Sequence, residues 1–332
     1  MRKKSSFNLT RRAVTAAVLF GALAAPFSQA FAADQYPDKP VHVIVGYPPG
    51  GATDVITRLI AQKLHDKLGQ TFIVENRPGA GSNIASAYVA RSKPDGYTLL
   101  VLTIQNATNM SIYKNLTYNT EKDFTPIAQF MASPSVLVTA PGLPATDLKS
   151  FIALVKANPG KYSYASTGIG GSPHLAGEML KARTGIDMLH VPYKGTAPAL
   201  IDVTAGVVSC SFMTTLGVVK QMQTGQVRPI AVAYSSRLPE LPNVPTMAEA
   251  GLPDFEVVSW NGLAAPAGTP QPVIDKLSTA VEDILKSPDM QERIKELGGQ
   301  AVLRSQKDFA AYVHSETVKW GVVAKSAKIE LD

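Results

Sequence analysis

Cysteine is nearly absent from the sequence, which has Cys210 alone among 332 residues. A single cysteine excludes an internal disulfide, so stability must come from the hydrophobic core. Cys210 lies in the apolar run 207–212, and we expect its side chain to be buried. The chain is long enough for one large domain or two ordinary ones.

Long apolar runs are missing beyond residue 32, so we expect a soluble mature chain. Residues 1–32 hold five basic side chains among the first twelve positions, an uncharged, mostly apolar run at 13–27 and small residues around the end. This pattern is typical of a cleavable secretory signal peptide. We predict cleavage near Ala32 and a periplasmic protein, exported by the general or the twin-arginine route.

A strong net charge is missing from the predicted mature chain. The full sequence carries a formal charge of +6, and removing the five basic residues of the leader leaves +1. Nucleic-acid binding requires a clustered basic face. We therefore expect no nucleic-acid partner.

Enzyme motifs are missing as well. The sequence has no Gly-x-Ser-x-Gly elbow and no P-loop, and in 168–173 a proline stands where a dinucleotide fingerprint needs its third glycine. Its five histidines lack metal-ligand spacing. We predict no catalytic residue, no metal and no cofactor. A periplasmic hydrolase remains an alternative, which requires a nucleophile, a base and an oxyanion site within reach of one another.

Strand and helix patterns alternate along most of the mature chain, which predicts an α/β fold with mostly parallel sheets. The expected strands are 41–46, 71–75, 98–102, 127–130, 136–140, 162–165, 188–191, 207–212 and 230–233. The expected helices are 53–68, 83–91, 147–157, 174–184, 197–205, 216–223, 273–286, 288–297 and 306–324. Prolines near one third and four fifths of the chain mark where it passes between lobes. We predict one lobe from 33–140 plus 260–332 and a second from 141–259.

Glycine-rich turns precede four of the predicted helices, at 49–54, 77–83, 166–174 and 193–198. Backbone N–H groups at a helix start have no intrahelical partner and attract anions. The expected N-caps are Thr53 or Asp54, Ser172 and Thr196. Ligands of open α/β sheets bind outside the carboxyl ends of the strands. Two turns fall in each predicted lobe, which favours an interlobe cleft rich in N–H donors over glycines that serve tight turns alone.

Short motifs over the whole mature chain carry a family resemblance. They are 36–40 (YPDKP), 47–51 (YPPGG), 74–80 (VENRPGA), 95–99 (DGYTL), 164–168 (YASTG), 190–195 (HVPYKG), 241–251 (LPNVPTMAEAG), Trp260 and 265–270 (APAGTP). In order and spacing they resemble the substrate-binding proteins of the tripartite tricarboxylate transporter family, also called the Bordetella uptake gene (Bug) family.

The resemblance implies a two-lobed periplasmic binding protein fold, type II-like, that closes on a ligand held between the lobes. It implies a small carboxylate bound through backbone amides, hydroxyls and ordered water, and delivery to the permease subunits of a tripartite tricarboxylate transporter. We expect a monomer; presentation of the ligand to a membrane sensor is an alternative. The residues at matching positions are Tyr47, Gly50, Gly51, Asp54, Ser82, Asn83, Ser166, Thr167, Gly170, His174, Tyr193, Gly195, Thr196 and Ala197.

The sequence departs from the family pattern at four places, among them Ser209, where an acidic residue is common, and Asn261, where an aromatic residue is frequent. At 103–107 the family often has a serine-rich turn with a histidine, whereas this chain has Thr103 and Gln105, which we add to the candidate ligand contacts. Met213 stands where an aspartate is common and cannot pair with an ammonium group. A methionine there suits an apolar ligand body or belongs to the core. The first reading favours a non-amino organic acid, aromatic or aliphatic.

Four more side chains allow several readings. His174 can contact the ligand, act with Ser172 in catalysis or, as we favour, make structural bonds. Tyr193 and Trp260 can close the core or, as we slightly favour, stack on the ligand. Asp54 reads as a helix cap whose carboxylate could position water in the cleft.

Overall fold

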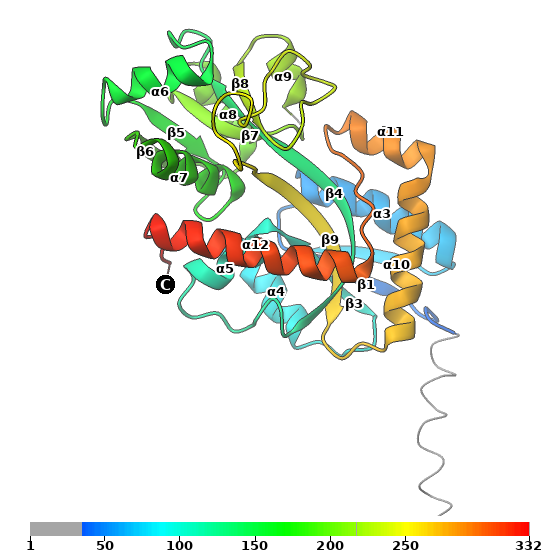
Figure 1. Cartoon of the computed structure of the whole chain (residues 1–332). Helices are drawn as coiled ribbons and strands as arrows, with labels where there is room; N and C mark the ends of the chain where they lie inside the picture. Colours follow the sequence, from blue (N-terminus) through cyan, green and yellow to red (C-terminus); the bar gives the residue numbers. More distant parts are fainter. Residues whose placement is uncertain (1–34, 217, 332) are drawn as a thin grey trace, which may run out of the picture.

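The strands form one connected sheet in the order β2-β1-β3-β9-β4-β7-β5-β6, with β8 also paired to β4 (Figure 1). The computed structural model describes residues 35–216 and 218–331, and the predicted signal peptide lies outside them. The strands are β1 (Val41–Val45), β2 (Phe72–Asn76), β3 (Thr98–Thr103), β4 (Phe124–Thr139), β5 (Ser163–Ser166), β6 (Leu189–Pro192), β7 (Cys210–Thr214), β8 (Arg228–Ala233) and β9 (Val258–Pro266).

Parallel pairing is confined to the two ends of this order. β1 pairs in parallel with β2 and β3, and β5 with β6 and β7. In the middle, β9 is antiparallel to β3 and β4, and β4 to β7 and β8. The α/β class is confirmed, but a mostly parallel sheet is wrong for the centre. The sheet thus has two blocks of parallel strands, one with β1, β2 and β3 and the other with β5, β6 and β7. β4 and β9 carry the chain between these two blocks in opposite directions (Figure 1).

The long strands differ from the prediction. β4 is continuous where we expected two strands separated by Pro134, because Pro134 pairs with Val258 at the end of the β9 ladder and Ser135 then turns to β7 and β8. A proline is tolerated at such a change of partner. β9 was not predicted. Its nine residues are nearly all buried, so they lack the alternation that marks a half-exposed strand.

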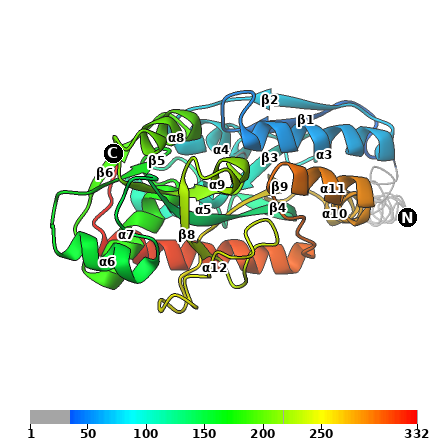
Figure 2. The same cartoon turned by 90° about the horizontal axis from the view of Figure 1, so that it is seen from above.

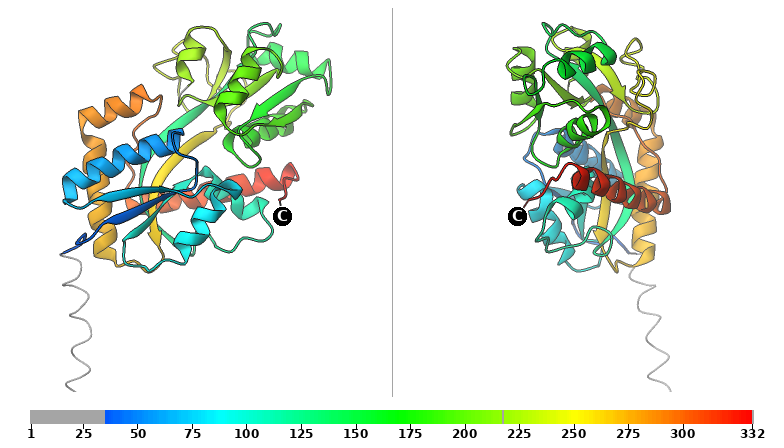
Figure 3. Two further views of the ribbon diagram at one scale, coloured as in Figure 1. Left: turned by 180° about the vertical axis from the view of Figure 1, so that it is seen from behind. Right: turned by 60° about the vertical axis from the view of Figure 1, so that its left-hand side comes forward.

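The helices follow the predicted ranges within a few residues, except for α5, which was not predicted. They are α3 (Ala52–Leu68), α4 (Asn83–Ala90), α5 (Ile104–Ile112), α6 (Leu148–Lys156), α7 (Ser172–Thr184), α8 (Thr196–Thr204), α9 (Val219–Gln223), α10 (Gln271–Lys286), α11 (Pro288–Glu296) and α12 (Gln306–Ser326). Figure 2 shows α3 and α12 on opposite sides of β4 and β9. In the views of Figure 3, α12 runs beneath the block of α6, α7 and β5.

The core contains several residues that the sequence singled out. Trp260 is fully buried and packs edge-to-face on Phe309, with ring centroids 5.7 Å apart, so the prediction that it stacks on a ligand is wrong. Its neighbour Gly262 leaves room for the Phe309 ring, since a Cβ there would lie 2.3 Å from that ring. Cys210 is buried as expected, and burial raises the pKa of its thiol to about 12.

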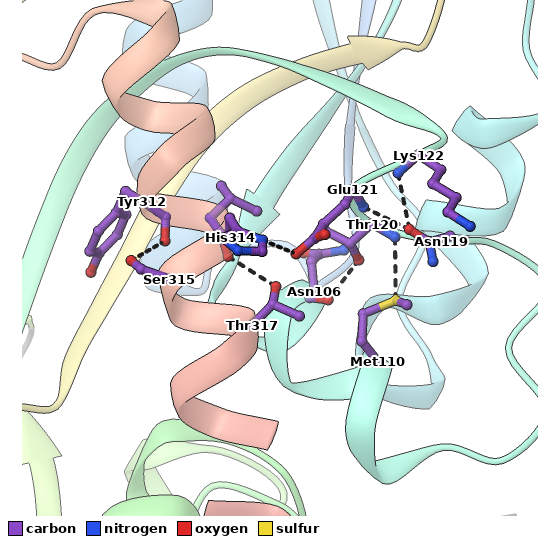
Figure 4. A network of polar contacts seen from close by, with 11 residues as sticks. Asn106, Met110, Asn119, Thr120, Glu121, Lys122, Tyr312, His314, Ser315 and Thr317 are labelled. Carbon is purple, nitrogen blue, oxygen red and sulfur yellow. Dashed lines mark hydrogen bonds and ion pairs between the residues drawn. The ribbon is translucent and has the colours of Figure 1, made fainter. Parts of the chain in front are cut away.

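A polar network ties α12 to the start of α5 (Figure 4). His314 of α12 contacts Glu121, with 3.0 Å between Nδ1 and Oε1. The neighbouring Thr120 hydroxyl donates to the Asn106 carbonyl of α5 at 2.7 Å. Asn106 in turn accepts the backbone N–H of Thr103 at 2.9 Å, which completes a capping box. The network braces the first turn of a helix that begins at the site described next.

Candidate functional site

A cleft of about 630 Å³ lies between the two blocks of the sheet, where four helices begin. It is walled by residues from the turns after β1, β3, β5 and β6 and by side chains of β7 and β9. Its lining residues are Tyr47, Pro48, Pro49, Gly50, Gly51, Ala52, Thr53, Thr103, Ile104, Gln105, Thr167, Gly171, Ser172, Pro173, Lys194, Gly195, Thr196, Ala199, Ser211, Phe212, Met213, Thr214, Leu216, Ser259 and Asn261.

Three of the four helices that begin at the cleft have no side-chain cap. α3, α7 and α8 begin one or two residues earlier than expected, with Gly51, Gly171 and Gly195 as N-caps and no side-chain hydrogen bond to the first turn. The predicted caps therefore lie inside the helices. Uncapped first-turn N–H groups and the positive end of the macrodipole favour an anion at this position.

Asp54 does not line the cleft. Its carboxylate instead positions the first glycine-rich turn, 49–54, through hydrogen bonds. Its carboxylate accepts hydrogen bonds from the Gly50 N–H at 2.9 Å, from Asn76 at 2.8 Å and from Arg58 at 3.1 Å. Burial alone would raise the pKa of Asp54, but these donors outweigh it and lower the pKa. Asp54 thus stays ionised while Arg58 balances its charge. This positions Gly50 and Gly51 without adding a free negative charge to the cleft.

Tyr47 joins the first turn to the start of α5. Its hydroxyl lies 2.8 Å from the Thr103 hydroxyl and donates to the Gln105 side-chain carbonyl. Burial raises the pKa of Tyr47, so the phenol stays neutral and serves as a hydrogen-bonding group. All three residues line the cleft, and together they form one polar wall.

The second predicted turn lies outside the main cleft. Ser82 is 1% exposed and borders a neighbouring hollow of about 490 Å³, which shares Tyr47, Gln105 and Thr167 with the cleft. The Asn83 side chain accepts hydrogen bonds from Asn109 and Tyr118, both at 2.7 Å. A direct ligand contact of Ser82 or Asn83 stays a prediction.

The third turn reaches the cleft through Thr167 and the start of α7. Ser166 is fully buried behind it, and His174 is 6% exposed with its Nδ1 accepting the Gly170 N–H at 3.1 Å. The structure thus contains the structural bond that we favoured for His174. Contact of Ser166, Gly170 or His174 with a ligand is not shown by this arrangement.

The fourth turn contributes Gly195 and Thr196, and Lys194 lies beside them. Tyr193 does not line the cleft. Its hydroxyl donates to the Asp202 carboxylate at 2.6 Å. Burial, as the larger cause, and this hydrogen bond raise the pKa of Tyr193 to about 12. This geometry gives no support to stacking of Tyr193 on a ligand. Ala197 lies one residue further into α8 and is also outside the lining.

Several lining residues were not among the predicted contacts. Ser259 and Asn261 come from β9, and the Asn261 side chain donates to the Thr53 hydroxyl at 3.2 Å. Ser211 and Thr214 come from β7. The available signal was a set of hydroxyl and amide side chains inside otherwise apolar runs, which a buried strand carries only where they meet a partner or a cavity.

The cleft is nearly uncharged. Its lining contains no aspartate or glutamate, and Lys194 is the one ionised side chain among the described lining residues. Met213 lines the cleft and also belongs to a buried apolar cluster, so its place in the core is confirmed and its contact with a ligand stays a prediction. Phe212, Leu216 and Ile104 are further apolar residues of the lining.

The part of the chain that the structure describes adds two negative findings. It contains no cluster of three potential metal-ligating side chains. Its helices include none that is both long and apolar enough to cross a membrane.

A Ser–His contact does occur, with 2.6 Å between Ser166 Oγ and His190 Nε2, but Ser166 is fully buried. A nucleophile there has no access to substrate.

Comparison with known proteins agrees with this geometry. Residues 56–329 match the model of the tripartite tricarboxylate transporter family receptor. Three solved structures are similar. The periplasmic binding protein BugD is 37% identical with a TM-score of 0.79, covering 89% of this chain and 99% of its own. Rpa4515 of R. palustris, solved with adipate, is 35% identical with a TM-score of 0.81 and coverages of 89% and 99%. MatC of Rhodopseudomonas palustris, solved with malate, is 34% identical with a TM-score of 0.78 and coverages of 87% and 99%.

The family match extends over most of the described residues, and the solved relatives share the fold along nearly their whole length. The chain therefore belongs to the tripartite tricarboxylate transporter receptor family and is a solute receptor rather than an enzyme.

Proposed function

We propose that this receptor captures a small organic carboxylate without an ammonium group in the cleft between its two blocks of sheet. It then delivers the ligand to the permease subunits of a tripartite tricarboxylate transporter. Adipate and malate, found in the two relatives from Rhodopseudomonas, define the size class. The receptor acts as a periplasmic monomer whose signal peptide ends near Ala32.

The observation that carries this proposal is the charge pattern of the cleft. Three uncapped helix starts point donors into a space whose lining has no carboxylate. An anion gains hydrogen bonds there without like-charge repulsion. An ammonium group would lose its hydration and find no anionic partner. The apolar side chains around Met213 accommodate the carbon skeleton between polar ends.

Direct contacts come from the predicted residues that line the cleft: Tyr47, Gly50, Gly51, Thr103, Gln105, Thr167, Gly195, Thr196 and Met213. Among the other predicted residues, Asp54 and His174 position the turns. The two lobes are 33–140 with 260–332, and 141–259. β4 and β9 are the long strands that connect them, so closure bends the chain there. For this function, the bound ligand has only to stabilise the closed arrangement of the lobes relative to the open one.

A thermal-shift screen with matched pairs tests the proposal. Adipate and 2-aminoadipate share a carbon skeleton and differ by one ammonium group. A ligand at a hundred times its Kd stabilises the native state by about 2.7 kcal/mol, which raises Tm by several degrees in a protein of this size. We expect at least one carboxylate of four to six carbons to raise Tm, and its amino analogue to have a much smaller effect.

The control is 1,6-hexanediol, which keeps the adipate skeleton but has no charge. Equal shifts with the diol and the acid would refute the anion site. A larger shift with the amino acid than with the simple acid would refute the proposed selectivity.

A further inference from the structure

A stack of three rings lies behind residues 166–172, the part of the third turn that precedes His174. The imidazoles of His174 on α7 and His190 on β6 have centroids 4.0 Å apart and planes inclined by 16°. Tyr164 of β5 stacks on His190 at 4.9 Å. His174 is 6% exposed. The proposed ligand contacts use neither imidazole.

The hydrogen bond from Gly170 fixes the protonation state of His174. The Gly170 N–H lies 3.1 Å from His174 Nδ1. Because a backbone N–H can only donate, Nδ1 carries no proton, and the neutral ring has its proton on Nε2. A charged His174 would present a second N–H to the same donor. This geometry of the turn therefore requires the neutral imidazole.

Gly170 is also held from the opposite side. Its carbonyl accepts the hydroxyl of Thr108 on α5 at 3.2 Å. Its φ is +77°, and a Cβ would lie 2.3 Å from the Ile112 side chain of the same helix. Only a glycine fits so close to α5 in this conformation. The turn is thus fixed between α7, through its N–H, and α5, through its carbonyl.

The surroundings favour the neutral ring. Burial lowers the pKa of His174 to about 4; His190 and Lys181 add to this, while Glu178 acts against it. Burial also lowers the pKa of His190, where Glu178 again opposes the shift and Lys181 adds to it. A stacked pair of imidazoles cannot accept two charges at this distance without strong repulsion.

The acidic group near the stack is already engaged. Glu178 accepts the Tyr164 hydroxyl at 2.6 Å and pairs with Lys181 at 2.9 Å, both through the same oxygen. Cys210 of β7 is also near Tyr164, and its buried thiol is neutral because burial raises its pKa. Glu178 is therefore partly neutralised and gives limited support to a protonated His174.

We propose that neutral His174, stacked on His190, is a positioning residue that holds the 166–172 turn in place and releases this wall of the cleft when it is protonated. The inference rests on the proposed function in taking this cleft as the ligand site. The hold on the turn exists without a ligand, so it can be tested separately.

Amide hydrogen exchange of the ligand-free protein measures that hold. In an opened turn His174 regains an ordinary pKa near 6.5, so acid favours opening. The protection factor of the 166–172 amides, corrected for intrinsic exchange rates, should fall by roughly thirtyfold between pH 7.5 and pH 5.0. Peptides from β1 should change far less.

Matched variants separate the titration from the packing. In His174→Asn the side-chain carbonyl offers a neutral acceptor near the position of Nδ1, so the pH-dependent loss of protection should shrink to the part that His190 contributes, since burial lowers the pKa of His190 as well. His174→Leu removes the acceptor, and protection should be low at both pH values. His190→Gln removes the stacked ring together with the contact of Nε2 to Ser166 Oγ at 2.6 Å, and it should reduce the pH dependence. His65→Asn, at an exposed position on α3, is the control and should behave as wild type. Circular dichroism verifies that each variant is folded.

Equal protection at both pH values in the wild type would overturn the proposal. So would a pH-dependent loss in His174→Asn as large as in the wild type. If His174→Asn does not fold, an unchanged pH dependence in His190→Gln overturns the role of the stack. Since no ligand is added, a failed carboxylate screen leaves this result standing, and a failed exchange experiment leaves the screen standing.

Discussion

Replacing Gly51 with aspartate should abolish anion capture and leave the fold intact. Gly51 is the N-cap of α3, with φ −76° and ψ 165°. A Cβ there would meet only the Pro48 carbonyl, at an ordinary 3.6 Å. Aspartate is among the best N-cap residues, because its carboxylate accepts first-turn N–H bonds and complements the macrodipole. Gly51→Asp should therefore keep or slightly raise the Tm of the unliganded receptor.

The same carboxylate opposes a bound anion. Two unit charges about 5 Å apart repel by about 3 kcal/mol at an effective dielectric constant of 20. This corresponds to roughly a hundredfold increase in Kd. The new side chain also occupies N–H donors that the ligand would use. Charge and competition act in the same direction, so the estimate is a lower bound.

Isothermal titration calorimetry with the strongest carboxylate from the thermal-shift screen measures the effect. Gly51→Asn is the matched control, since it has the same size and caps the helix equally well but has no charge. We expect Gly51→Asn to weaken binding far less than Gly51→Asp. A Kd for the aspartate variant within threefold of the asparagine variant would show that α3 does not bind the anion.

Further predictions concern stability and reactivity. Asp54→Asn should lower the free energy of unfolding by about 2–3 kcal/mol, because it removes a buried, hydrogen-bonded charge; chemical denaturation measures this. The buried thiol of Cys210 should react with a thiol reagent only after denaturant is added, as native and unfolded labelling rates would show. Gly262→Ala should cost about 1–3 kcal/mol, since its Cβ would overlap the Phe309 ring and lie 2.9 Å from the Ala128 carbonyl oxygen; Phe309→Leu in the same chain should relieve only the overlap with the ring. Because the folded pKa of His174 lies below its unfolded value, its contribution to stability is complete above about pH 6.5. It should fall by about 3 kcal/mol as the pH drops to 4, so thermal melts of His174→Asn should show a weaker pH dependence.

Local signals in the sequence were sufficient to predict the positions of most helices. α10 and α12 have clear amphipathic or capping patterns, and Pro270 precedes the first of them. α5 was missed because it follows β3 directly, without glycine or proline between them. Its signal was the spacing from Thr103 to Asn106, which forms the capping box. An asparagine is a weaker marker at that position than the usual glutamate or glutamine.

The site was harder to predict, because contacts between segments far apart in the sequence decide which residues line the cleft. The four turns look alike in the sequence, yet the second is held away from the main cleft by hydrogen bonds from Asn109 and Tyr118 to Asn83. Asn261 was noticed only as an unusual residue beside Trp260. Its place in the lining follows from β9, a strand without any alternating pattern.

The two turns that face each other across the cleft are positioned by opposite electrostatic means. Asp54 holds the first turn as a permanent anion whose charge is balanced by Arg58. His174 holds the third as a neutral acceptor. Neither side chain lines the cleft, so the field at the ligand comes from helix starts and Lys194. Substitutions in the lining should therefore change affinity through charge at every pH. Substitutions behind it should act through geometry, and at His174 that effect should depend on pH.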